Sequence, residues 1–288
     1  MNARRQVNEK TPKDSHYARL RRNYRDAKNG SNSRDGNKQW RPRPHEEAQN
    51  VPDGVVRLYG LHTVRHALEN DAREVLKLYL TPNARERLEV DDALLSKLNV
   101  VESTPRELDK LVGSSAVHQG CVLEAKPLEA KTLAQVSDCP LILVLDQVTD
   151  PHNVGAIMRS AVAMGANVLI TTSRHSPVET GVLAKSASGA LDMIDHIEAR
   201  NLANALGELH KLGYQTIGLD SEGPDVLENS ISGQKVALVM GNEGKGLRQK
   251  TRETCTTLAR VDMPGAIKSL NVSNAAALAL YIVSSKQA

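Results

Sequence analysis

The sequence has 288 residues, a formal net charge of +3 and 40% hydrophobic residues, which is enough for two modest domains. Their cores must be aliphatic, because phenylalanine is absent and tryptophan occurs once. It contains no run of about 18 apolar residues and no apolar segment near the N-terminus, so we expect neither a membrane span nor a secretory signal. Three cysteines (Cys121, Cys139 and Cys255) lack metal-ligand spacing and cannot all pair, which argues against zinc and disulfide frameworks and favours a reducing, cytoplasmic setting with no metal.

The N-terminal segment, residues 1–53, is basic and poor in aliphatic side chains. Residues 1–50 hold 13 Lys and Arg against 6 Asp and Glu, so the net positive charge of the chain comes from this segment. It offers too little apolar surface to offset the entropy of ordering, so we expect it to be disordered. Basic disordered arms bind nucleic acid through phosphate contacts, although solubilising tails and targeting segments have a similar composition.

Residues 54–127 are predicted to form a small α/β unit, followed by a linker at 128–139. In chain order the unit comprises a strand that ends at Gly60, a helix with apolar Leu61, Val64, Ala67 and Leu68, a strand at 74–81, a helix at 83–98, a strand at 99–104, a helix from Pro105 and a strand at 120–127. His62 and His66 lie four apart on the first helix. No acidic third ligand accompanies them, so we interpret them as ordinary helix residues.

Residues 140–288 are predicted to form a second, larger α/β domain. Strands are expected at 141–146, 167–172, 214–220, 235–241 and 257–262, and helices at 153–164, 181–187, 202–212, 247–254 and 272–284. Strands that alternate with helices favour a parallel sheet covered by helices on both faces.

The segment "DPHNVGAIMRSA", residues 150–161, follows the first strand of this domain and contains a single arginine, Arg159, among small and apolar residues. Asn153 is placed to cap the helix. Arg159 would lie over Gly155 and Ala156, which leaves its guanidinium room to reach back toward the strand end, where open parallel sheets bind ligands. Such a group suits a phosphate or a sugar oxygen, and the alternative is an arginine that only extends into solvent.

The segment "VMGNEGKGL", residues 239–247, runs from the end of the strand at 235–241 into a glycine-rich loop. Gly241, Gly244 and Gly246 allow the backbone to approach a ligand closely. The loop matches neither a Walker A motif nor the dinucleotide fingerprint, and it comes late in the domain, which argues against a Rossmann enzyme.

The third segment, "SLNVSNAAALALY", opens the last predicted helix. Ser269, Asn271 and Ser273 cluster at its start, where they can cap the helix or bind a ligand. The alanines that follow permit very close packing against the sheet or another subunit. Taken singly, this segment and the glycine loop are more typical of a capped core helix and a tight turn.

Together and in this order, the three segments resemble the signature motifs of the SpoU (TrmH-like) RNA 2′-O-methyltransferases of the SPOUT superfamily. The resemblance covers residues 141–285. The unit at 54–127, with "YGLHTVRHALEN" and "SSAVHQGCVLEAKP", looks like the small RNA-binding domain that precedes the catalytic domain in this family. The arrangement is most similar to that of bacterial enzymes that methylate a guanosine ribose in large-subunit (23S) rRNA.

The resemblance implies a fold and partners that the residue pattern alone does not predict. It implies a deep trefoil knot in the C-terminal domain, an exception to the general rule of unknotted chains. It also implies S-adenosyl-L-methionine bound in the knot, an RNA substrate, and a homodimer formed through the C-terminal domain.

The resemblance also assigns residues to roles. Arg159 is implied as the catalytic arginine, with Asn153, Glu243, Ser269 and Asn271 as the other polar site residues. The glycine loop at Gly241 and the segment around Val261, Met263 and Leu270 would hold the cofactor. Because a guanidinium holds its proton firmly, we prefer Arg159 as an anchor and orienting group over a role as a base.

One departure and three alternatives stay open. Where the family commonly has Ile-Pro-Met, this chain has Val261-Asp262-Met263-Pro264. Glu243 beside Lys245 could alternatively form a surface ion pair of little energetic weight. The substrate could instead be tRNA, or the chain could be a non-catalytic RNA-binding factor of ribosome assembly.

Overall fold

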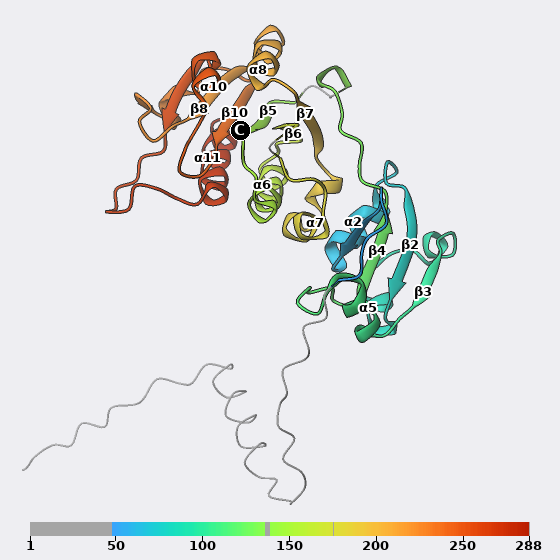
Figure 1. Cartoon of the computed structure of the whole chain (residues 1–288). Coiled ribbons are helices and arrows are strands. Elements are labelled where there is room, and N and C mark those ends of the chain that lie inside the picture. Colours follow the sequence, from blue (N-terminus) through green and yellow to red (C-terminus); the bar gives the residue numbers. More distant parts are fainter. Residues whose placement is uncertain (1–47, 136–138, 175, 288) are drawn as a thin grey trace, which may run out of the picture. The chain divides into compact units, whose positions relative to one another are not determined.

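The computed structural model describes residues 48–135, 139–174 and 176–287 (Figure 1). The predicted disorder of the basic segment concerns residues that lie almost entirely outside this range. Within the described residues, no helix combines the length and the apolar character needed to cross a membrane.

The N-terminal part of the described chain forms a four-stranded sheet with the order β1-β4-β2-β3. The strands are β1 (Val56–Tyr59), β2 (Val75–Leu80), β3 (Val100–Glu102) and β4 (Cys121–Ala125), and the longer helices are α2 (Leu61–Glu69) and α5 (Pro105–Val112). β4 runs antiparallel to β1 and β2, whereas β3 runs parallel to β2. α5 begins as predicted, because Thr104 and Glu107 form a reciprocal capping box around Pro105.

The single helix predicted at 83–98 is wrong. The structure has two short helices there, α3 (Pro82–Arg87) and α4 (Asp92–Leu95). Glu89 adopts a positive φ of 53°, which interrupts a right-handed helix. The Asp91 carboxylate then accepts a hydrogen bond from the Ala93 amide and starts a new helix, a competing local interaction that periodicity does not reveal.

The C-terminal part forms a seven-stranded sheet with the order β7-β6-β5-β10-β8-β11-β9, and every pairing in it is parallel. Its strands are β5 (Leu141–Asp146), β6 (Val168–Thr172), β7 (Asp195–Ala199), β8 (Gln215–Leu219), β9 (Asp225–Val226), β10 (Val236–Gly241) and β11 (Thr257–Arg260). The five predicted strands are present. β7 and β9 were not predicted. They lie at the two edges of the sheet, where β7 buries only Ile197 and Ala199 and β9 has only two residues.

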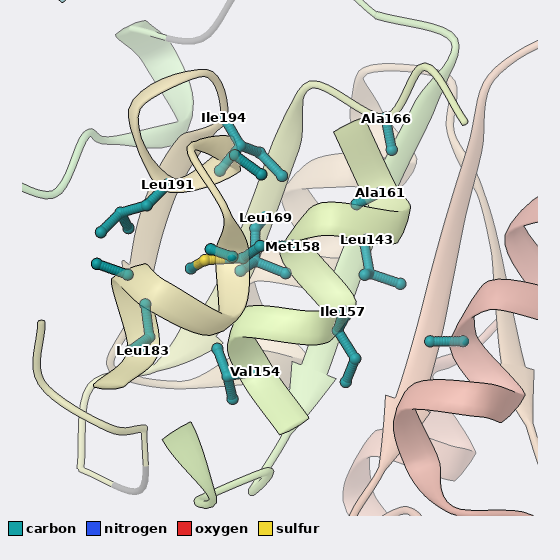
Figure 2. Close-up of a cluster of buried hydrophobic side chains, with 14 of the residues drawn as sticks. Leu143, Val154, Ile157, Met158, Ala161, Ala166, Leu169, Leu183, Leu191 and Ile194 are labelled. Atoms are coloured by element: carbon teal, nitrogen blue, oxygen red, sulfur yellow. The ribbon is translucent and has the colours of Figure 1, made fainter. Parts of the chain in front are cut away.

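Helices cover both faces of this sheet, as the alternating pattern predicted. They are α6 (Pro151–Ala163), α7 (Gly181–Ala187), α8 (Leu202–Lys211), α9 (Leu227–Ser230), α10 (Gln249–Thr254) and α11 (Val272–Gln287). Successive residues of β5 alternate between two cores: Leu143 packs with α6 and α11, whereas Ile142 packs with α8. Figure 2 shows the first of these cores around Met158 of α6.

Helix α6 begins earlier than predicted, and Asn153 does not cap it. The helix starts at Pro151, and the cap is Asp150, whose carboxylate accepts a hydrogen bond from the amide of His152 at 2.9 Å. Asp150 with proline at the first helical position is a preferred helix start. Asn153 therefore lies within the first turn, with its side-chain amide free for another partner.

Candidate active site

The carboxyl ends of β5 and β10 lie side by side, because these strands pair in parallel with Gly241 opposite Asp146. The chain after β5 enters α6, and the chain after β10 forms the glycine loop. Helix α11 packs against both α6 and β10, so its start reaches the same edge of the sheet. The three segments singled out in the sequence thus meet at one place, where parallel sheets bind ligands.

Asn271 joins the three segments. Its Nδ2 donates to Oδ1 of Asn153 at 3.1 Å and to Oε2 of Glu243 at 3.4 Å. Its Oδ1 accepts from the Ser273 amide at 2.9 Å and so caps α11. Because the cap fixes which end of the Asn271 amide faces the helix, the donor end must face Asn153 and Glu243.

Arg159 lies on α6, beyond the first turn that carries Asn153, and its side chain is exposed to solvent. Within the described parts of the chain, no side chain pairs with its guanidinium. A permanently charged group with no carboxylate beside it is available to an anionic ligand. Gly155 has a separate packing role: a Cβ atom there would lie 2.5 Å from the Leu183 carbonyl oxygen of α7.

The glycine loop folds back on itself directly after β10. The Asn242 and Gly246 backbones exchange hydrogen bonds of 2.9 and 3.2 Å, and the Asn242 side chain donates to the carbonyl oxygen of Gln147. A side chain at Gly241 would collide with the backbone of Gly246. Gly244 has a φ of +89° and open space around it, so the rim of the loop is accessible to a ligand.

Glu243 does not form the surface ion pair with Lys245 that was the alternative. In the described residues, the recorded partner of the Glu243 carboxylate is Asn271, and no ion pair involves Lys245. Ser269, in contrast, is exposed and makes no recorded hydrogen bond to Asn153, Glu243 or Asn271. The structure therefore assembles three of the predicted polar residues and leaves Ser269 at the margin.

An ionic contact that the sequence analysis missed anchors the glycine loop. Asp146, at the end of β5, has a fully buried side chain that accepts from the Arg248 amide at 3.0 Å and from Arg248 Nε at 2.7 Å. A bidentate, charge-assisted contact of this kind fixes the far end of the loop against β5. The signal in the sequence is a single acidic residue that closes the apolar strand "LILVLD".

The segment between β11 and α11 carries the other predicted cofactor residues. Val261 packs on the core, the Met263 carbonyl oxygen accepts from Lys268 Nζ at 2.5 Å, and Leu270 is 40% exposed. Ile267 is 75% exposed. Open backbone and unpaired apolar side chains beside a glycine loop fit a ligand that combines an apolar ring with polar edges, as S-adenosyl-L-methionine does.

Comparison with known proteins agrees with this architecture. The SpoU rRNA methylase family model matches residues 140–281, and the model for RNA 2′-O ribose methyltransferase substrate binding matches residues 57–131. The 23S rRNA (guanosine-2′-O-)-methyltransferase RlmB of Ralstonia nicotianae is 38% identical over 231 residues, which cover 78% of this chain and 93% of the relative. The chain belongs to the SpoU family. The resemblance found in the sequence is thereby confirmed.

Further SpoU relatives extend the comparison. RlmB of Pseudomonas putida is 36% identical over 238 residues, which cover 79% of this chain and 95% of the relative. The SpoU methyltransferase AviRb of Streptomyces viridochromogenes, solved in complex with the cofactor AdoMet, has a TM-score of 0.68 and 23% identity. That match covers 81% of this chain and 91% of AviRb, and it establishes a shared fold.

Proposed function

We propose that this chain transfers a methyl group from S-adenosyl-L-methionine to the ribose 2′-hydroxyl of a guanosine in 23S rRNA. Its SpoU membership and the RlmB relatives support the reaction and the substrate. The observation that carries the proposal is the contact of Asn271 with both Glu243 of the glycine loop and Asn153 of α6, the helix that also presents Arg159. A non-catalytic RNA-binding protein has no need for this arrangement.

The cofactor would be held by the glycine loop at Gly241 and by the segment that contains Val261, Met263 and Leu270. When bound, S-adenosyl-L-methionine supplies an electrophilic methyl group on a sulfonium. The protein's contribution is to hold that group and the ribose in line, because orientation alone removes a large part of the barrier to group transfer. The buried Asp146 holds the loop in place for this purpose.

Arg159 would act as an anchor and not as a base. A guanidinium keeps its proton at any pH at which the protein is folded. Its planar fork can bind a phosphate next to the target ribose, orient the 2′-hydroxyl and stabilise negative charge that develops on the oxygen. Asn153, Glu243 and Asn271 would position the ribose through their mutually oriented polar atoms, and Ser269 would join them only when ligands are bound.

We also propose that two copies pair through α11. Leu278 and Tyr281 are 39% and 58% exposed on one side of the helix, and the exposed Ile267 and Leu270 lie on the segment that leads into it. Large apolar side chains gathered at one place favour a contact with another protein surface. A two-fold pairing would place the same patch of each copy against the other and cover both cofactor segments.

We propose the following domain limits: a basic segment at 1–53, a substrate-binding unit at 54–127, a linker at 128–139 and a methyltransferase domain at 140–288. The matched ranges 57–131 and 140–281 support these limits.

In the larger sheet, β10 follows β8 in the chain and yet lies between β5 and β8. The knot that the family resemblance implies is compatible with this order, and the rRNA substrate supports a cytoplasmic location.

The decisive experiment measures methyl transfer from labelled S-adenosyl-L-methionine to unmodified 23S rRNA, to assembling large-subunit particles and to tRNA. We expect label on the ribose of a guanosine in 23S rRNA, and we expect Arg159→Ala to lower kcat by about 10²-fold or more. Arg159→Lys keeps the charge without the planar fork and should recover only part of that loss. Label on tRNA alone would overturn the substrate, and no transfer to any RNA would overturn the reaction.

A further inference from the structure

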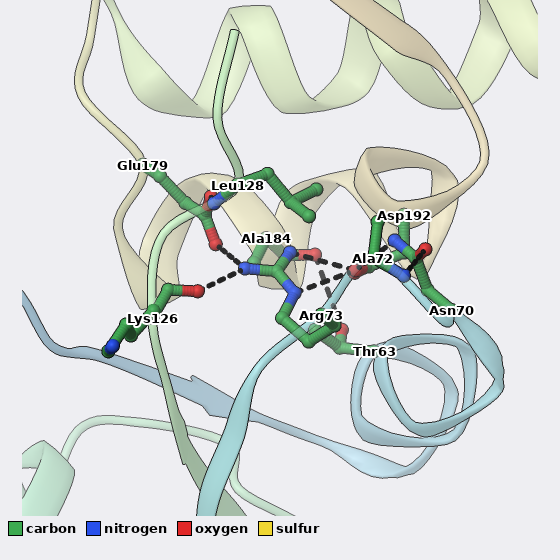
Figure 3. Close-up of polar contacts among 9 residues, drawn as sticks. All are labelled: Thr63, Asn70, Ala72, Arg73, Lys126, Leu128, Glu179, Ala184 and Asp192. Atoms are coloured by element: carbon green, nitrogen blue, oxygen red, sulfur yellow. Dashed lines mark hydrogen bonds and ion pairs between the residues drawn. The ribbon is translucent and has the colours of Figure 1, made fainter.

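Arg73 lies between α2 and β2, in the four-stranded part of the chain, and its side chain has no exposed surface. Its Nε and Nη2 lie 2.9 and 2.8 Å from Oδ1 of Asp192, and its Nη1 donates to Oε1 of Glu179 at 2.5 Å and to the Lys126 carbonyl oxygen at 3.1 Å (Figure 3). Both carboxylates belong to the methyltransferase part of the chain. Arg73 therefore connects the four-stranded part of the chain with the methyltransferase part.

The two carboxylates make further contacts besides those with Arg73. The side chain of Asp192 is completely buried, and its Oδ1 also accepts from Nδ2 of Asn70 at 3.1 Å. The second oxygen of Glu179 accepts from the amide of Leu128, which ties down the start of the connecting segment. Burial raises the pKa of Glu179, and the charge of Arg73 opposes that shift. Buried charges of this kind persist only when they are paired. Loss of the arginine or of a carboxylate partner therefore favours separation of the four-stranded part from the methyltransferase part.

Helix α7 fits the same interface without spare room. A side chain at Gly181 would collide with the Arg57 carbonyl and the Tyr59 ring of β1, and one at Gly189, which follows α7, would collide with His66 of α2. Thr63 Oγ1 also donates to the Ala184 carbonyl at 3.2 Å.

On its other side, α7 packs on α6 at Gly155, where a Cβ atom would lie 2.5 Å from the Leu183 carbonyl oxygen. Ser186 of α7 lies 3.2 Å from His152 Nδ1, next to Asn153. Close-packed backbones have little freedom to slide. A rigid path therefore runs from β1 and α2 through α7 to the helix that carries Arg159.

From this path we infer that Arg73 is a positioning residue for the methyl transfer, an inference that rests on the proposed function. It holds the substrate-binding unit in one orientation relative to α6, so that RNA bound to that unit presents a single ribose to Arg159. An unanchored unit could still bind RNA, but it would offer several riboses and would concentrate the correct one less effectively at the site.

The test compares Arg73→Ala with Arg65→Ala in the full chain. Arg65 lies in α2 of the same unit, and its ion pairs with Glu69 and Glu89 are exposed, so its loss controls for a missing arginine. We expect Arg73→Ala to raise KM for 23S rRNA about tenfold or more, to add methylated riboses beyond the normal one, and to leave kcat at saturating RNA within about threefold. Arg65→Ala should match the wild type in all three measurements. Unchanged KM and an unchanged methylation site in Arg73→Ala would overturn the inference.

Two further measurements separate this inference from the proposed function. Hydrogen exchange of α2 and α7 amides needs no substrate, and exchange should accelerate in Arg73→Ala and not in Arg65→Ala. If no RNA is methylated by the wild type and yet exchange accelerates, the anchoring role stands and the proposed function fails. Asp192→Asn removes a charge at constant size, serves if Arg73→Ala does not fold, and should produce the same changes; unaltered exchange in it would also overturn the inference.

Discussion

At the scale of single residues, the structure gives polar side chains roles that their sequence neighbours do not suggest. Asp146 ends an apolar strand and anchors a loop that lies about a hundred residues further along the chain. Asn271 caps its own helix with one end of its amide and joins two other segments with the other. In both cases the residue type is visible in the sequence, whereas the partner depends on which strands pair.

His196 of β7 makes stability depend on pH. Its Nε2 lies 2.8 Å from Thr171 Oγ1, and burial lowers its pKa below the usual 6.5. The unfolded chain therefore binds a proton at a higher pH than the folded chain does, so the free energy of unfolding should fall as the pH drops from about 6.5 through the lowered pKa. Urea denaturation at pH 7.5 and pH 5.5 measures this fall.

His196→Gln is the comparison, because glutamine can hydrogen-bond to Thr171 and does not titrate. The variant should lose less stability than the wild type between pH 7.5 and pH 5.5. An equal loss in both proteins would show that His196 does not contribute to the acid sensitivity.

At the scale of elements, the packing of α6 against α7 depends on the absence of a side chain. Gly155 faces α7 so closely that the Leu183 carbonyl and the Ala187 amide would contact any Cβ atom. Sequence periodicity predicts the existence of both helices, because each has a buried apolar side. It does not predict how close they come, since that distance is set by two segments that fold against each other.

Gly155→Ala should lower the free energy of unfolding by about 1–3 kcal/mol, the usual range for an overpacked contact with backbone atoms. Urea denaturation monitored by circular dichroism measures the change. Gly207→Ala is the matched control, because Gly207 lies within α8 and no atom lies within 4 Å of a Cβ atom built there. That substitution should raise stability by about 0.5–1 kcal/mol, the helix preference of alanine over glycine. Equal effects at the two positions would contradict the packing argument.

At the scale of the whole molecule, one chain forms a mixed sheet and a parallel sheet, and charged contacts fix the connecting segment against the parallel sheet. Lys131, in the predicted linker, pairs with the edge strand β7 through its backbone and forms an ion pair with Asp195 at 2.5 Å. The exposed side of α11 is the other large-scale feature, because its apolar Leu278 and Tyr281 form the surface that we propose pairs with a second copy.

Leu278→Asp should weaken self-association at least about thirtyfold, the effect of losing 2 kcal/mol at an interface. Because the paired copies would cover both cofactor segments, methyl transfer should fall with dimer content. Sedimentation velocity across a dilution series measures the association. Leu212→Asp is the control, since Leu212 follows α8 and is 53% exposed. A protein that remains dimeric and active with Leu278→Asp would exclude α11 as the interface.

Local pattern determined much about this protein. Apolar runs bounded by turns predicted five of the seven strands in the larger sheet and its parallel arrangement, because a strand buried on both faces is apolar throughout. The three motifs with Arg159, Asn153, Glu243 and Asn271 were also visible, and their catalytic roles stay a prediction. The weakly apolar β7 and the break at Glu89 were missed, because an edge strand buries little and a single backbone torsion leaves no periodic signal.

Only the tertiary structure decided which side chains meet. The Asn271–Asn153 contact, the Asp146–Arg248 anchor and the burial of Arg73 between Asp192 and Glu179 each join residues about a hundred or more positions apart. The physical reason is that hydrogen bonds and ion pairs act only over a few ångströms, and the order of strands in the sheet decides which distant residues come that close.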